Sequence, residues 1–204
     1  MKNTITTLIL CLSPIVQCQS TTNEDGHFLK RIENNYANRV IVELPNGKTD
    51  GIYNLDSKSA MEKRFFGDFN APVEYFVDPS FRPVTGFRIY PDSSGTSYLL
   101  ETKTKDRTKD TIVSHQISIS DQMANTIYAK TMHLIDTFTA KGKPDMIFDG
   151  DLVTFRCVVQ NELWTFTIHE PYGNVQKTSD LFRAMIADVE AGRFDEAKYR
   201  EALN

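Results

Sequence analysis

The clearest pattern of hydrophobic and polar positions lies between residues 152 and 169, where two alternating runs flank Gln160-Asn161. Folding the chain about these two residues pairs Val159 with Glu162, Cys157 with Trp164, Phe155 with Phe166 and Val153 with Ile168 on one mostly apolar face. The other face is half-polar and pairs Val158 with Leu163, Arg156 with Thr165, Thr154 with Thr167 and Leu152 with His169. A shift of one residue would mix the two faces. The pattern therefore predicts a hairpin in this register, with its half-polar face toward solvent or at a rim.

Further strands are predicted where β-branched and aromatic residues gather between turn signals. They are residues 39–44, 73–77, 87–90, 96–102 and 112–119, with a possible edge strand at 146–148 before the turn Asp149-Gly150. Pro91 to Gly95 predicts a hairpin turn. Residues 103–110 form the most polar stretch of the chain, which indicates a solvated loop or hairpin tip.

Four helices are predicted from their start and stop signals. Ser59 and Glu62 fit a capping box for residues 60–66, and Gly67 fits the stop. A long amphipathic helix follows Ser120 as N-cap, with His133 on its polar face beside Gln122, Asn125 and Thr126. A helix with Ser179 as N-cap ends before Gly192, and Phe194, Asp195 and Tyr199 indicate a short terminal helix.

This order of elements predicts an α+β fold: one domain, residues 27–204, with a mostly antiparallel sheet and helices packed on one face. The length of 204 residues suits one ordinary domain. A hydrophobic fraction of 40% and a charged fraction of 25% are typical of a globular protein.

The N-terminus predicts export. Lys2 precedes an apolar stretch, residues 5–16, which is too short to span a bilayer and fits a signal peptide over residues 1–18. Residues 19–26 then form a flexible leader. Cys18 leaves a lipid anchor open as an alternative, although Gln17 stands where a lipoprotein normally has a small residue. The expected location is the periplasm or cell surface of a bacterium, and no membrane-spanning segment is expected.

The cysteines and the charge narrow the class of protein further. Removal of residues 1–18 would leave Cys157 alone, so the exported chain would rest on its hydrophobic core and not on a disulfide. The whole chain has a net charge of -4 and no long run of like charges, which argues against nucleic acid as a partner.

Three groups of residues are candidates for chemistry. Cys157 could be a nucleophile, but its apolar face and its partner Trp164 favour a structural role, because burial disfavours the thiolate. His169 and Glu170 end a strand, with Asp149 as a third catalytic candidate, yet neighbours on a strand point to opposite faces and rim residues are the plainer interpretation. Asp145, Asp149 and Asp151 do not match the spacing of a calcium loop.

We expect no metal site and no cofactor, since the four histidines lack ligand spacing and nucleotide or hydrolase motifs are absent from the sequence. The segment 65–90 is rich in aromatic residues interleaved with arginine. Its candidate binding residues are Tyr75, Phe81, Arg82, Arg88 and Tyr90. They could form a contact platform, or they could fill the core.

Two hypotheses of function follow. The first is a non-enzymatic exported protein of the envelope that binds another exported protein, as an accessory factor, an inhibitor or an immunity-type partner. The alternative is a small hydrolase or lyase with a non-local active site near His169 and Glu170. A concave pocket holding His169 and a second titratable group would favour the enzyme, and an exposed aromatic patch would favour the binding protein.

Overall fold

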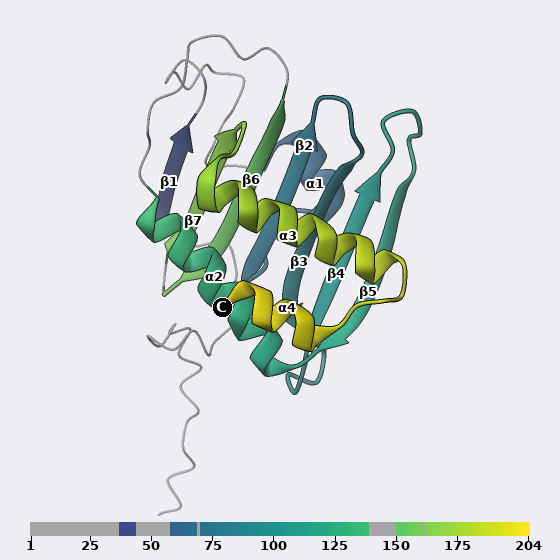
Figure 1. Ribbon diagram of the computed structural model, residues 1–204, viewed down its shortest axis with the longest axis vertical. Helices are drawn as coiled ribbons and strands as arrows, with labels where there is room; N and C mark the ends of the chain where they lie inside the picture. Colours follow the sequence, from purple (N-terminus) through teal and green to yellow (C-terminus); the bar gives the residue numbers. More distant parts are fainter. Residues whose placement is uncertain (1–36, 44–57, 69, 139–149, 161) are drawn as a thin grey trace, which may run out of the picture.

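The computed structural model describes residues 37–43, 58–68, 70–138, 150–160 and 162–204, and these residues form one layered α+β unit (Figure 1). The strands are β1 (Ala37–Glu43), β2 (Val73–Pro79), β3 (Val84–Pro91), β4 (Tyr98–Lys105), β5 (Ile112–Ile119), β6 (Asp151–Val159) and β7 (Glu162–His169). The helices are α1 (Ala60–Phe66), α2 (Asp121–Thr137), α3 (Gly173–Glu190) and α4 (Glu196–Leu203).

The strands form a seven-stranded sheet in the order β1-β7-β6-β2-β3-β4-β5. Strands β2 to β5 form a meander of neighbours, and the β6–β7 hairpin lies between β1 and β2. All pairings are antiparallel except that of β1 with β7, which is parallel. The predicted class is confirmed: an α+β fold with a mostly antiparallel sheet.

The β6–β7 hairpin has the predicted register in every pair from Leu152 with His169 to Val159 with Glu162. Gln160 takes a positive φ of 54° at the turn. The expectation that the second face lies at solvent or a rim is wrong, because Thr154, Arg156 and Thr165 are all buried. A buried ion pair between Arg156 and Glu62 of α1 shows why a polar face is tolerated there.

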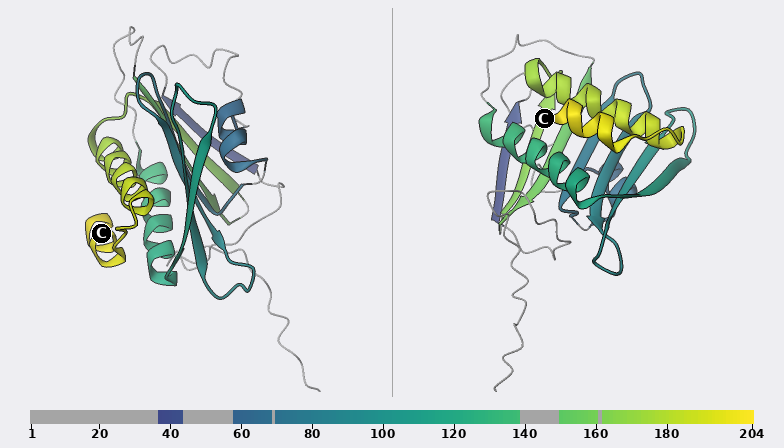
Figure 2. Two further views of the ribbon diagram at one scale, coloured as in Figure 1. Left: turned by 90° about the vertical axis from the view of Figure 1, so that its right-hand side faces the viewer. Right: turned by 60° about the horizontal axis from the view of Figure 1, so that its bottom comes forward.

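The helices are unequally divided between the two faces of the sheet. Figure 2 shows α2, α3 and α4 on one face, called here the three-helix face, and α1 on the other, called the α1 face. The prediction of one helical face holds for these three helices and not for α1. The reason is the alternation along β2: Tyr75 points into the three-helix core, whereas Phe76 packs with Phe65 and Phe66 of α1.

Most predicted helix ends are confirmed by their caps. Ser59 and Glu62 form the full capping box of α1, and the Ser120 hydroxyl accepts from the Met123 amide at the start of α2. At α4, Asp195 accepts from the amides of Ala197 and Lys198. The hydrophobic staple beside it is formed by Phe194 and Tyr199, whose stacked rings lie 5.5 Å apart.

The start of α3 differs from the prediction. The helix begins at Gly173, and Ser179 lies inside it and is fully buried. Its hydroxyl lies 2.6 Å from the Tyr75 hydroxyl, so it binds a core side chain and does not cap a helix. The polar loop predicted over residues 103–110 starts later than expected, because β4 runs to Lys105. Lys103 is held in the sheet, where its ammonium donates to the Phe65 carbonyl oxygen.

The three-helix face carries the main core, which is rich in aromatic rings. Phe182 of α3 lies 5.2 Å from Tyr75, 5.0 Å from Phe87 and 6.1 Å from Phe155, as measured between ring centroids. Cys157 belongs to the same core and is fully buried, in agreement with its structural interpretation. Among the described residues, none of the helices is long and apolar enough to cross a membrane.

Several predictions fall outside the described residues. They are the signal peptide over residues 1–18, the leader over residues 19–26 with Cys18 before it, the strand at residues 146–148 and the candidate Asp149. They stay predictions.

Candidate functional site

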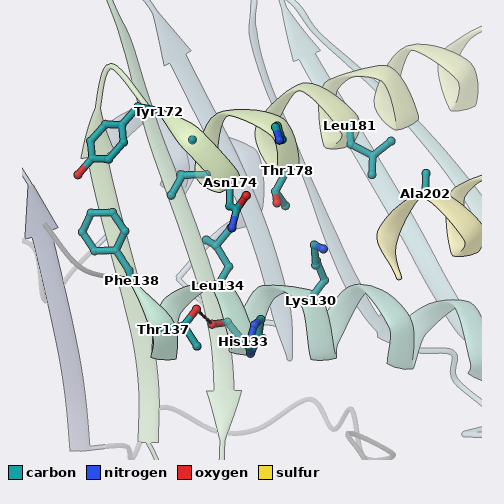
Figure 3. Close-up of a pocket in the computed structure, with 13 residues that line it drawn as sticks. Lys130, His133, Leu134, Thr137, Phe138, Tyr172, Asn174, Thr178, Leu181 and Ala202 are labelled. Atoms are coloured by element: carbon teal, nitrogen blue, oxygen red, sulfur yellow. Dashed lines mark hydrogen bonds between the residues drawn. The ribbon is translucent and has the colours of Figure 1, made fainter. Parts of the chain in front are cut away.

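A groove of about 470 Å³ lies between α2 and α3, on the side of the helices near the C-terminus of α2 (Figure 3). We call it the α2–α3 groove. Its volume falls in the range of ordinary ligand sites. It is lined by Lys130, His133, Leu134, Thr137, Phe138, Tyr172, Gly173, Asn174, Val175, Lys177, Thr178, Leu181 and Ala202.

Helical spacing builds both walls of the groove. On α2 the lining positions recur after three or four residues, from Lys130 through His133 and Leu134 to Thr137. The α3 wall shows the same spacing from Asn174 to Leu181. Ala202 of α4 stands beyond Leu181 at the other end of the groove (Figure 3).

One end of the groove is closed by two aromatic side chains. Phe138 follows α2 and Tyr172 precedes α3, and their ring centroids are 6.3 Å apart. Phe138 is itself held on the sheet, with its ring 4.4 Å from that of Phe166 in β7. This end of the groove therefore offers apolar surface anchored to the core.

The floor and rim of the groove differ in chemistry. Leu134, Val175 and Thr178 are buried and form the floor. Lys130 and Lys177 stand at the rim, and within the described part of the chain neither ammonium has a carboxylate within 4.0 Å. The described lining residues include no aspartate or glutamate. The groove is thus locally positive in a chain whose net charge is -4.

The start of α3 adds to this positive character. Gly173 and Asn174 line the groove, and the first turn of α3 contains no acidic residue and no side-chain cap. The first amides of a helix carry partial positive charge, which favours an anion nearby. Gly173 has a φ of 57°, a conformation that suits glycine at the bend from β7 into the helix.

The catalytic candidates His169 and Glu170 lie at the end of β7 and do not line the groove. Glu170 has a positive φ of 57°, and its carboxylate accepts a 3.1 Å hydrogen bond from the Asp151 amide. The carboxylate therefore closes the junction between β6 and β7. His169 remains in the sheet, opposite Leu152.

Near these candidates, Asp151 joins two arginines that come from distant segments. Arg82 of the β2–β3 turn and Arg183 of α3 both donate to the Asp151 carboxylate. Burial alone would raise the pKa of Asp151, but the hydrogen bonds and positive charges of Arg183 and Arg82 hold that pKa below its usual value. A second cavity of about 240 Å³ lies beside these arginines. The one carboxylate is bound by both guanidinium groups and is used in structural contacts.

The aromatic and arginine candidates do not form one platform. Tyr75 is fully buried, so it belongs to the core and offers no contact surface. Arg88 lies over the ring of Tyr90 at 4.9 Å on the α1 face and binds Glu101. Phe81 is 82% exposed and stands next to Arg82, also exposed, at the β2–β3 turn.

Local sequence patterns indicate few of the residues that make the groove. His133 lies on the exposed side of its helix, as predicted, but Asn125, predicted for the same polar face, is buried. Lys130 and Lys177 lie more than forty positions apart and gave no local signal. A positive, carboxylate-free groove becomes visible when α2 and α3 are packed together.

Comparison with known proteins adds no assignment: no family model, no curated protein and no solved structure matches the chain. The described residues also contain no group of three or more histidine, cysteine, aspartate or glutamate side chains that could hold a metal ion. The geometry of the groove is therefore the feature of the molecule that bears most directly on function.

Proposed function

We propose that this chain is an exported envelope protein that works by binding, and that the α2–α3 groove receives an acidic, apolar segment of another exported protein. The observation that carries this proposal is the lining of the groove. Buried Leu134 and Val175 form its floor, and Lys130, His133 and Lys177 stand around it without a carboxylate among the described lining residues.

The chemistry of the partner follows from this lining. A segment with one or two carboxylates beside leucine or phenylalanine side chains would place its acids near the lysines and its apolar groups on the floor. Complementary charge would speed association, whereas the apolar contacts would slow dissociation. The role of an accessory factor, inhibitor or immunity-type partner fits such a surface equally well.

Binding has more support than the hydrolase or lyase alternative. The carboxylate of Glu170 is bound to the backbone of Asp151, and Asp151 is bound by two arginines, so both acids are used in structural contacts. Neither His169 nor Glu170 faces the groove. Within the described residues, neither the α2–α3 groove nor the second cavity is lined by His169 or Glu170, so these residues give the alternative less support.

The test uses the full chain, tagged after Asn204 through a long linker and expressed in its native cells. A photo-crosslinking residue at Thr137, on the wall of the groove, should capture a protein with an acidic, apolar segment. The purified pair should then lose affinity by at least tenfold when Lys130→Glu or Lys177→Glu reverses the charge at the rim.

Lys63→Glu is the matched control, because it makes the same charge change on exposed α1, on the other face of the sheet. It should leave the affinity within twofold of the wild type. Equal binding by all three variants would overturn the proposal. So would native mass spectrometry that finds a small amphiphile in the groove in place of a protein partner.

A further inference from the structure

We propose that β5 pairs with β5 of a second copy of this chain, antiparallel and across a two-fold axis at His115, so that one sheet continues through both copies. This inference concerns the edge of the sheet and goes beyond the groove. In Figure 1, β5 is at the opposite side of the sheet from β1 and β7, whereas Phe138 and Tyr172 of the groove lie over the β7 side.

The first support is the unprotected character of β5. It is the last strand of the sheet, and within the described chain it pairs with β4 alone. Its pairing with β4 runs from Ile112 to Ile119 without a bulge, and the strand contains no proline and no charged residue. Natural proteins usually protect an exposed edge with lysine, proline, a bulge or a cover, because a bare edge pairs with other chains.

The second support is an apolar stripe on β5. Val113 is 52% exposed, and together with Phe81 it makes up the exposed large hydrophobic residues of the described chain. Ile117 is partly buried against the core on the same face of the sheet. A strand added at this edge would cover both side chains.

The pattern of the strand selects the register. Residues paired across two antiparallel strands lie on the same face of the sheet. A two-fold axis between two copies of β5 must therefore lie midway between the two copies of one residue, so that this residue pairs with itself. With the axis at His115, Val113 of each copy faces Ile117 of the other, which gives two apolar pairs around the centre. An axis at Ser114 or Gln116 would pair Val113 with His115 or with buried Ile119 instead.

Charges beyond the ends of β5 agree with an antiparallel contact. Lys109 lies in the turn before β5 and Asp121 begins α2 shortly after it, so opposite charges flank the two ends of the strand. Both side chains are exposed, and no ion pair joins either of them to another described residue. Opposite charges at both ends of the contact would favour the antiparallel arrangement.

The test is the mass of the purified protein in solution, measured by sedimentation over a range of concentrations. We expect a concentration-dependent dimer. Val113→Lys should abolish it, because each copy would then place a lysine on the edge strand opposite Ile117 of the other copy, and an edge lysine opposes further pairing. Phe81→Lys is the matched control, since it makes the same kind of change at an exposed apolar residue away from β5, and it should leave the dimer intact.

A cysteine scan then tests the register. His115→Cys should form a disulfide-linked dimer under mild oxidation, because the residue on the axis meets its own copy. Ser118→Cys should not, since it faces Ile112 of the second copy. Both variants are made with Cys11→Ser and Cys18→Ser, and Cys157 is buried, so the introduced cysteine is the one available for the link. A monomeric wild type, or a dimer that persists in Val113→Lys, would overturn the proposal.

Discussion

The two faces of the sheet bury different kinds of side chain. The three-helix face carries the apolar core, where the rings of Tyr75 and Phe182 contact each other and both contact Phe87 and Phe155. The α1 face carries a row of alternating charge across four neighbouring strands: Glu101, Arg88, Glu74 and Arg156. One sheet thus combines a core held by non-directional packing with a face where oriented polar contacts supplement the small cluster of Phe65, Phe66 and Phe76.

The charged row also fixes the position of α1. Arg156 binds Glu62 of α1, and Lys58 binds Glu74 at 2.7 Å, with all four side chains buried. At the other end of the helix, Arg88 donates to the Phe66 carbonyl oxygen at 2.9 Å, where cations are favoured by the helix dipole. Apolar packing therefore anchors helices on both faces, whereas the charged row adds oriented contacts that fix the position of the short helix α1.

The largest expected effect comes from the apolar face. Phe182→Ala removes a ring that touches three other aromatic residues and should lower the free energy of unfolding by about 3–5 kcal/mol. Urea denaturation followed by far-UV circular dichroism measures the change. Phe81→Ala, at an exposed position, should stay within about 0.5 kcal/mol of the wild type. Similar losses for both would contradict the assignment of the core.

The α1 face should be almost as sensitive to the loss of one charge. Arg156→Met leaves Glu62 and Glu74 buried without their arginine and should cost about 3 kcal/mol in the same assay. Adding Glu62→Gln removes one of these buried charges, so the double variant should regain part of the loss. A double variant that is less stable than Arg156→Met would show that the pairing is not the cause.

The ion pair between Glu62 and Arg156 on the α1 face should also make stability depend on acid. Burial alone would raise the pKa of Glu62, but the charge and hydrogen bonds of Arg156 keep it below the ordinary value of 4.5. Since the folded-state pKa is the lower one, its contribution to stability is complete above about pH 4.5 and is lost as the pH falls through the folded-state value. Urea midpoints measured from pH 6 downward should therefore fall less steeply in Arg156→Met than in the wild type.

The smallest expected effect concerns the caps. Ser59→Ala breaks the capping box of α1 and should cost about 1 kcal/mol. Asp195→Ala makes the corresponding change at α4, on the three-helix face, and should cost a similar amount. Hydrogen exchange should localise each loss to its own helix. Loss of protection across the whole sheet in Ser59→Ala would mean that α1 does more than attach to its face.

Local patterns in the sequence predicted much of the fold. The β6–β7 register followed from strict alternation, and the starts of α1, α2 and α4 followed from their capping residues. The start of α3 could not be predicted in this way, because Ser179 has the residue type of an N-cap but binds Tyr75, far away in the sequence. Likewise, a half-polar strand face predicts exposure to solvent. The face of β6 is buried instead because Arg156 has a distant partner, Glu62, that the local pattern does not indicate.

The candidate site was less predictable than the fold. Its walls come from two helices separated by the whole β6–β7 hairpin, so neither helix alone shows a groove. The strand-end candidates were chosen because strand ends often carry function. In the structure Glu170 instead fastens the junction of β6 with β7 through the Asp151 amide.

The strand order also constrains how the chain folds. The β2–β5 meander consists of sequential pairings, which close short loops and form quickly. In contrast, β1 pairs with β7, which follows it by more than a hundred residues. The second neighbour of β2 is β6, which also lies far along the chain. The pairings of β2 with β6 and of β1 with β7 close much longer loops than any pairing within the meander, so the order of strands predicts that they form after it.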